Sequence, residues 1–462
     1  MKLKNKTLLQ QLSLAFAPLA LFALAPQAHS ADYADYAAGT GVAGNTNPGG
    51  LYTPAPKPAA DSFTGALTGG TVTANLQTRY ENVEQHTSGK KEAHAATARL
   101  RLGYETAEYN GFGGMVQIEH ISANDAYNSR ANGMTGYSVV GDGNVTEINQ
   151  AYISYSGLPQ TRLKFGRQLI RLDNDRWLGN VVWRQNHQTY DGVTAVNTSL
   201  RDTTITAGYI TNVNRVFSDA SIDPVAGSAT GSFLGNHQMK SQIYNVNYKG
   251  LGFAELVGYG YFLDYDPSAL AFGKANSTKT IGGRIKGDTP IADGYKLLYT
   301  AEYAGQSAYK DNPVDYTAHY TLLEGGVDAK NFQVKLGYEV LSSALASDGT
   351  RKSLSTPLAT LFAFNGWADV FLVTPANGLR DAYINARTTV AGTVLGFDFH
   401  DYKADSGGSS YGTELDLIAS KRIDKTYSIG SRYARFRADS NVTGCAACID
   451  TNKLWVYGAM NF

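Results

Sequence analysis

The sequence predicts an all-β protein, a transmembrane antiparallel β-barrel of about eighteen strands. Three observations predict it. From about residue 71 onward, polar and apolar side chains alternate in segments of roughly ten residues, the length that a tilted strand needs to cross a bilayer. The connections alternate between short turns and long polar loops, and the final apolar-alternating segment ends in Phe462. Short periplasmic turns on one rim and long extracellular loops on the other are typical of such barrels.

The N-terminus has the composition of a secretory signal peptide, which we expect over residues 1–30. The first residues are rich in lysine, an apolar run follows, and Ala28 and Ser30 stand at the minus-three and minus-one positions of a cleavage site. A transmembrane anchor is the alternative, but prolines interrupt a run that is barely long enough to span. Residues 31–70, rich in Gly, Ala and Pro, are expected to form a flexible periplasmic segment, which leaves residues 71–462 for the barrel.

Closure of the sheet follows from the chemistry of the bilayer. Backbone groups in hydrocarbon have no water to bond, so a β-structure spans a membrane only when no strand edge is left open. A soluble secreted sandwich or propeller would also show alternation. It would not require the terminal Phe462 or the consistent difference between turns and loops. The expected location is therefore the bacterial outer membrane.

Alternation also assigns side chains to the lumen or to the lipid. In TVTANLQTRYENV, which starts at residue 71, Gln77, Arg79 and Glu81 alternate with apolar or small residues. Polar side chains of a spanning barrel face the lumen. Charges there can select anions, or they can serve only to hold water and order loops. The candidate pore-lining, anion-binding residues are Arg79, Arg99, Arg101, Arg162, Lys164, Arg284, Lys286 and Arg387.

One irregular loop concentrates arginine and tryptophan. RQLIRLDNDRWLGNVVWRQNH (residues 167–187) follows a strand that rises from a short turn and precedes a strand that descends, so it occupies an external loop. The segment resembles the signature region of the alginate-export family of outer-membrane barrels. The resemblance rests on Arg-Gln at 167–168, the acidic pair before Arg-Trp within 173–179, Trp-Arg-Gln at 183–185 and Tyr-Asp-Gly at 190–192.

The resemblance implies a monomeric eighteen-stranded barrel with a basic conduit and one loop folded inward. Its fold features run from about residue 71 to Phe462, whereas the motif covers only this loop and its flanking strands. The implied constriction-loop residues are Arg167, Arg171, Asp173, Asp175, Arg176, Trp177, Trp183 and Arg184.

Ion pairing within this loop is the expected way of holding it in place. Among Arg171, Arg176 and Arg184, some would pair with the two aspartates and one would be left over, while the tryptophans wedge the loop against the wall. Arg184 stands farthest in sequence from the aspartates, so we expect it to be the arginine left unpaired and therefore able to control selectivity. The alternative is that all these charges satisfy one another structurally.

Other chemistry is weakly indicated. The two cysteines, Cys445 and Cys448, are expected to form a small disulfide clip in an external loop, with a redox or metal-binding CAAC motif as the alternative. DND at 173–175 begins like a calcium loop, but Arg176 and Trp177 replace the residues that should continue it. No metal and no cofactor are expected. Equal numbers of basic and acidic residues, 40 of each, give no reason to expect nucleic acid.

The expected function is a porin-like channel for the diffusion or export of a small or polymeric anionic solute, a carboxylate or a saccharide. A phospholipase-like barrel enzyme is one alternative, but it needs a lipid-facing Ser and His at one rim, and His400 near Asp398 has no evident serine partner. A structural or adhesive surface barrel is the other. The expected partners are outer-membrane lipid and lipopolysaccharide, and the assembly machinery through the strand ending at Phe462. A monomer is expected.

Overall fold

The computed structural model describes residues 59–221, 234–266 and 271–462. The predicted signal peptide, and the part of the predicted flexible segment that precedes residue 59, lie outside the described residues.

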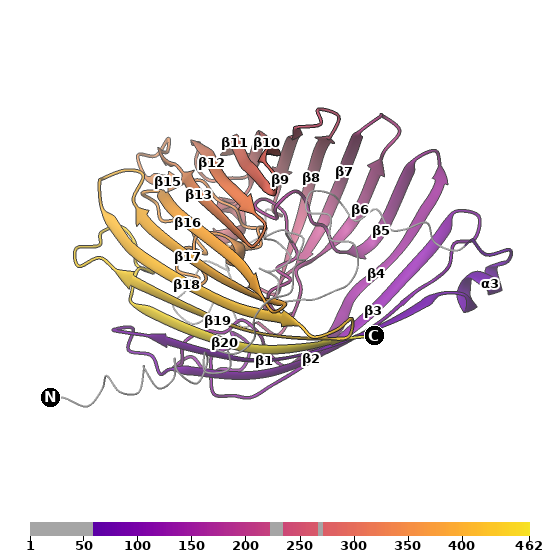
Figure 1. Ribbon diagram of the computed structural model, residues 1–462, viewed down its shortest axis with the longest axis horizontal. Helices are drawn as coiled ribbons and strands as arrows, with labels where there is room; N and C mark the ends of the chain where they lie inside the picture. Colours follow the sequence, from indigo (N-terminus) through magenta and orange to yellow (C-terminus); the bar gives the residue numbers. More distant parts are fainter. Residues whose placement is uncertain (1–58, 222–233, 267–270) are drawn as a thin grey trace.

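Eighteen antiparallel strands form one closed sheet around a central lumen (Figure 1). Each strand pairs with its neighbours along the chain, and β1 also pairs with β20, which closes the ring. The predicted fold class is thereby confirmed. The strands of the ring are β1 (Thr71–Gln85), β2 (Ala93–Glu105), β3 (Phe112–Ala123), β4 (Val145–Leu158), β5 (Thr161–Gln168), β6 (Thr189–Asn197), β7 (Thr203–Asn214), β8 (Asn236–Tyr248), β9 (Ala254–Leu263), β10 (Thr278–Ala292), β11 (Tyr295–Ala308), β12 (Thr317–Ala329), β13 (Phe332–Leu341), β16 (Leu379–Val390), β17 (Thr393–Lys403), β18 (Ser410–Arg422), β19 (Tyr427–Ala438) and β20 (Thr451–Asn461).

Short turns and long loops lie on opposite rims of this ring, as the sequence predicted. The strand bounds leave brief connections such as 159–160 and 391–392 on one rim and stretches such as 124–144 and 342–378 on the other. In barrels of this kind the turn rim is periplasmic and the loop rim is external. Among the described residues, no helix is long and apolar enough to cross a membrane.

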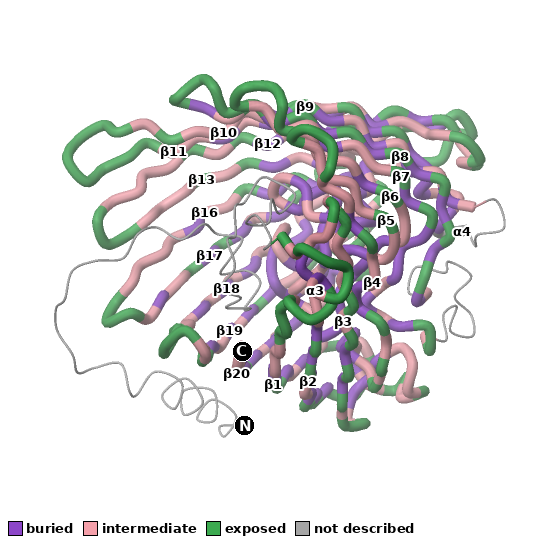
Figure 2. The backbone as a smooth tube through the Cα atoms, turned by 90° about the vertical axis from the view of Figure 1, so that its right-hand side faces the viewer, coloured by how far each residue is buried: buried purple, intermediate pink, exposed green. Residues whose placement is uncertain are grey.

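Side chains alternate between lumen and exterior along the strands. On β1 the inward Gln77, Arg79 and Glu81 are at most 3% exposed, whereas the outward Leu100 and Leu102 of β2 are 41% and 51% exposed. Figure 2 shows this alternation as buried and exposed stretches that follow one another along the strands. The apolar exterior suits hydrocarbon, and the polar interior suits a filled or hydrated lumen.

The end of the predicted flexible segment is ordered. Helix α3 (Phe63–Thr68) lies at the turn rim, next to the end of β2 (Figure 1). Its first turn is capped by Ser62, whose hydroxyl accepts a hydrogen bond from Gly65 N at 3.0 Å. The Tyr104 hydroxyl of β2 donates to Leu67 O and accepts from Gly70 N. A strand tyrosine therefore supplies backbone partners to residues 59–70 that composition does not reveal.

Two of the long loops fold into the lumen. Loop 3 comprises residues 169–188, and loop 7 comprises residues 342–378, which include β14 (Ser343–Leu345), β15 (Arg351–Ser353) and the 3-10 helix η2 (Leu361–Ala363). Helix α4 (Ala271–Ala275) belongs to another loop at the same rim. Cys445 and Cys448 are joined by a disulfide in the loop between β19 and β20.

Replacing Leu100 with arginine tests the assigned facing of β2. The substitution places a charge on the lipid side of a strand, so we expect it to lower the free energy of unfolding by about 2–4 kcal/mol. Leu100→Met is the matched control, because it conserves volume and polarity and should cost less than about 1.5 kcal/mol. Urea titration of protein refolded into lipid vesicles measures both values. Equal midpoints for the two variants would show that Leu100 does not face hydrocarbon.

Candidate functional site

A plug crosses the lumen, built from residues 170–188 of loop 3 and 354–371 of loop 7. The two segments are joined by backbone hydrogen bonds, from Gly179 N to Leu358 O and from Thr360 N to Asp175 O, both 3.0 Å. Gln188 Nε2 also donates to Leu358 O at 3.0 Å. Because backbone groups of one loop satisfy those of the other, neither segment can leave alone without exposing buried polar groups.

Aromatic rings form the centre of the plug. Trp183 stacks on Phe362 with ring centroids 4.2 Å apart, and it meets the edge of Trp455 on β20 at 5.6 Å. Two wall guanidinium groups cover the Trp183 ring, that of Arg79 at 4.2 Å and that of Arg432 at 4.5 Å. Stacking and cation–π contacts therefore fix loop 3, loop 7 and the barrel wall to one another.

Arg176 and Trp177 attach loop 3 to the wall. Arg176 Nε lies 3.2 Å from Glu339 of β13, and both side chains are nearly inaccessible. The Trp177 indole donates to Glu302 of β11 at 2.8 Å. Arg176 was predicted to pair with Asp173 or Asp175. That prediction was wrong, because the plug lies deep enough for the guanidinium to reach a wall carboxylate far away in sequence.

Arg184 has three acidic partners. Its guanidinium lies 3.0 Å from Glu81, 3.7 Å from Asp142 and 3.2 Å from Asp369. Burial opposes the charge of Arg184, but the three carboxylates outweigh it and raise the pKa above its ordinary value. The prediction that Arg184 is unpaired was therefore wrong. The distance in sequence from Asp173 and Asp175 did not indicate whether Arg184 is paired, because the partners of Arg184 come from β1, the loop at 124–144 and loop 7.

The two aspartates of loop 3 have separate surroundings. Asp175 accepts hydrogen bonds from Nε and Nη2 of Arg171, with Nη2 at 2.8 Å, so this predicted pair is present. Asp173 instead accepts from Asn245 of β8 at 2.9 Å. Burial raises the pKa of Asp173 to about 7, with Arg284 opposing the shift and Glu302 adding to it.

Arg167 does not belong to the constriction. It lies on β5 on the same face as Phe165, which is 67% exposed on the outside of the barrel. Its guanidinium pairs with Asp191 of β6 at 2.8 Å. The prediction was wrong because β5 continues through Gln168 before loop 3 turns inward.

The predicted pore-lining residues fall into two groups according to their contacts. Arg79, Arg99 and Arg101 lie beneath loop 3: Arg79 pairs with Asp142 at 3.3 Å, and the other two donate to Gln185 O. They support the plug, with Arg101 also bonded to Glu119. The remaining residues lie elsewhere on the wall. Arg162 lies near Glu108, Lys164 lies over the Tyr152 ring, and Arg387 is bonded to Asp398. Arg284 and Lys286 lie beside the inner cavity described below.

On the loop side of the plug lies a cavity of about 680 Å³, here named the vestibule. Its described lining contains one acidic residue, Asp369, and seven basic ones. Burial, and after it the neighbouring Arg130, lower the pKa of Lys90. The basic residues of the vestibule are Lys90, Arg130, Arg184, Arg215, Arg351, Lys352 and Lys453.

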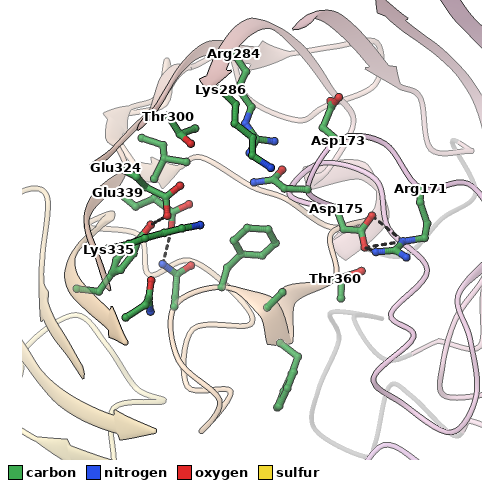
Figure 3. A pocket seen from close by; sticks show the side chains of 18 of the residues that line it. Arg171, Asp173, Asp175, Arg284, Lys286, Thr300, Glu324, Lys335, Glu339 and Thr360 are labelled. Atoms are coloured by element: carbon green, nitrogen blue, oxygen red, sulfur yellow. Dashed lines mark hydrogen bonds and ion pairs between the residues drawn. The ribbon is translucent and has the colours of Figure 1, made fainter. Parts of the chain in front are cut away.

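On the turn side lies a smaller inner cavity of about 140 Å³, which shares Phe362 as a lining residue with the vestibule. Figure 3 shows side chains from the strands and from loop 3 directed toward it, with Arg284 and Lys286 on one side and Glu324 and Glu339 on another. Its described charges are mixed, in contrast to the vestibule: Arg171, Arg284, Lys286 and Lys335 against Asp173, Asp175, Glu255, Glu324 and Glu339.

Loop 7 is the main part of the site that the sequence analysis missed. The Trp367 and Ala368 amides donate to Asp416 at 3.1 Å and Glu414 at 2.6 Å on β18, which holds loop 7 inside the lumen. A signal was present, because LATLFAFNGWADVFLV (358–373) is too apolar for a loop exposed to water. An apolar run inside a long external loop predicts a segment that folds back and is buried.

Comparisons with known proteins agree with this architecture. A family model described as alginate export matches residues 70–340. Among solved structures, OccAB1 of Acinetobacter baumannii is 12% identical with a TM-score of 0.64, covering 85% of this chain and 96% of its own. OccD3 of Pseudomonas aeruginosa is 14% identical with a TM-score of 0.61, covering 88% and 95%. OpdK of Pseudomonas aeruginosa, solved with vanillate, is 10% identical with a TM-score of 0.61, covering 85% and 98%.

No curated protein matches the sequence at a significant level. The solved structures support the barrel fold, and the family model covers more than half of the chain. The chain belongs to the alginate export family of outer-membrane β-barrels.

Proposed function

We propose that this protein is an outer-membrane channel for small anionic solutes that carry carboxylates. The observation that carries the proposal is the vestibule lining, with seven basic side chains and a single acidic one among the described residues. A cavity with walls of one sign concentrates counter-ions and speeds their entry. The fork of an arginine suits a carboxylate in particular.

The similar structure of OpdK with vanillate, a carboxylate, is consistent with this solute class. Membership of the alginate export family is consistent with a longer anionic saccharide as well. The plug favours the smaller solute, since loops 3 and 7 meet across the lumen and leave an inner cavity of only about 140 Å³. A polymer would require both loops to move.

An enzymatic role is not part of the proposal. His400, the histidine considered for a phospholipase-like site, faces the lumen and pairs with Asp381 at 2.9 Å. A lipid-cleaving site needs its histidine at the lipid face. Phospholipid hydrolysis by the purified protein would contradict this part of the proposal.

We also infer a monomer that is inserted through its last strand. One chain closes the ring by itself, so the lumen needs no second copy. Phe462 directly follows β20 (Thr451–Asn461) and is 70% exposed, available to the assembly machinery. Light scattering of detergent-solubilised protein that gives a dimer mass, or normal membrane insertion after deletion of Phe462, would contradict these inferences.

Reversal potentials in a potassium chloride gradient test the channel directly. We expect the parent protein to prefer chloride, and the variant with Arg351→Gln and Lys352→Gln to lose about half of that preference, because two vestibule charges are removed. Lys425→Gln, in the turn between β18 and β19, is the matched control and should behave as the parent. Cation preference in the parent would contradict the proposal.

The pH dependence of selectivity tests the inner cavity. Since the pKa of Asp173 is raised to about 7, its carboxyl is mostly neutral at pH 6 and charged at pH 8. The cavity becomes more negative as pH rises, so chloride preference should fall between pH 6 and pH 8. In Asp173→Asn the chloride preference should stay at its pH 6 value throughout this range. Asp348→Asn, in the exposed hairpin of loop 7, should show the same pH dependence of chloride preference as the parent. Identical slopes in the parent and Asp173→Asn would exclude this role for Asp173.

A further inference from the structure

Two cations at the floor of the vestibule, Arg184 and Lys453, and Arg79 beneath loop 3 have carboxylate partners that differ in origin. Arg79 pairs with Asp142, and Arg184 pairs most closely with Glu81. Lys453 of β20 pairs with Asp369, with Nζ 2.7 Å from Oδ2. The same Asp369 oxygen lies 3.2 Å from Arg184 Nη2, so it bridges the two cations.

Asp369 differs from Glu81 in belonging to a loop. Glu81 is part of β1, and its carboxylate is fixed by the barrel. Asp369 sits on loop 7, lines the vestibule together with Arg184 and Lys453, and has a positive φ of 59°. A left-handed backbone outside glycine costs free energy unless surrounding contacts maintain it, and the bridge to the two cations is one such contact.

We propose that Arg184 and Lys453 form a carboxylate-binding site on the vestibule floor, that Asp369 is its internal occupant, and that a solute carboxylate competes with Asp369 and releases this part of loop 7. The inference rests on the proposed function. It adds a specific site and a coupling, because an anion that enters the vestibule exchanges one carboxylate for another at the same two cations. Arg184 and Lys453 therefore have a carboxylate partner both before and after the exchange.

Asp369 is only two residues from Trp367, which belongs to the aromatic centre of the plug, so release of Asp369 would disturb this centre. Trp367 is buried, lies near-parallel to Phe362 at 6.0 Å, and has the Arg432 guanidinium 4.7 Å from its ring centre. Three of the four tryptophans of the chain, Trp183, Trp367 and Trp455, meet at this place. Solute binding at the floor therefore loosens the contact that separates the vestibule from the inner cavity.

Intrinsic tryptophan emission reports this movement without a label. In the full-length protein we expect a saturable red shift on titration with sodium acetate, and none with sodium chloride at equal ionic strength, because Trp367 becomes exposed to water. Trp367→Phe should remove the shift. An acetate titration that leaves the parent emission unchanged would overturn the proposal.

Asp369→Asn removes the internal carboxylate and keeps its shape. We expect its emission to be red-shifted before acetate is added, and acetate to bind, in isothermal titration calorimetry, at about tenfold lower concentration than in the parent, since no internal anion competes. Asp348→Asn, an exposed acid of the same loop, is the matched control and should match the parent in both measurements.

Lys453→Gln supplies a second test that keeps Asp369. It removes the closer cation, so emission should be red-shifted from the start and acetate should have no further effect. Parent-like emission and parent-like acetate response in both Asp369→Asn and Lys453→Gln would overturn the proposal. The channel assignment is judged separately, since it fails only if the parent protein lacks chloride preference.

Discussion

The hydrogen bonds between β1 and β20 are the constraint on which the rest of the structure depends. A sheet in hydrocarbon cannot leave an open edge, so closure is obligatory, and closure encloses a lumen that must be filled or hydrated. Alternation along each strand then places charged side chains inside in large numbers. Arg79, Glu81 and Arg99 are among those that are almost fully buried there. Each such charge needs a partner, which makes the interior a set of ion pairs.

Loops 3 and 7 supply many of those partners. Arg176 neutralises Glu339, Arg184 neutralises Glu81, and Asp369 neutralises Lys453. The plug is therefore held by the same electrostatic requirement that the closed ring creates, with aromatic stacking at its centre. The consequence for function is asymmetry, because the vestibule on the loop side is basic and the inner cavity on the turn side carries mixed charge.

Local sequence features predicted the barrel, its strand facing and its short and long connections, because alternation and turn composition are properties of neighbouring residues. The resemblance to the alginate export family, and not these features, implied that loop 3 folds inward. Its partners could not be predicted, since Arg176 to Glu339 and Arg184 to Asp369 join residues far apart in sequence whose proximity exists only after closure. Arg167 was misplaced for a related reason: the strand extends one residue past it, and facing changes with every residue.

Loops 3 and 7 together narrow the lumen between the vestibule and the inner cavity. Single-channel conductance in planar bilayers at symmetrical salt tests it most directly, comparing the parent protein with a variant that lacks Val181–His187. This segment contains Trp183 and Arg184, so its removal breaks both the aromatic stack and the principal ion pair of loop 3. We expect a clearly larger conductance in the shortened protein. A variant that inserts normally and conducts like the parent would contradict it.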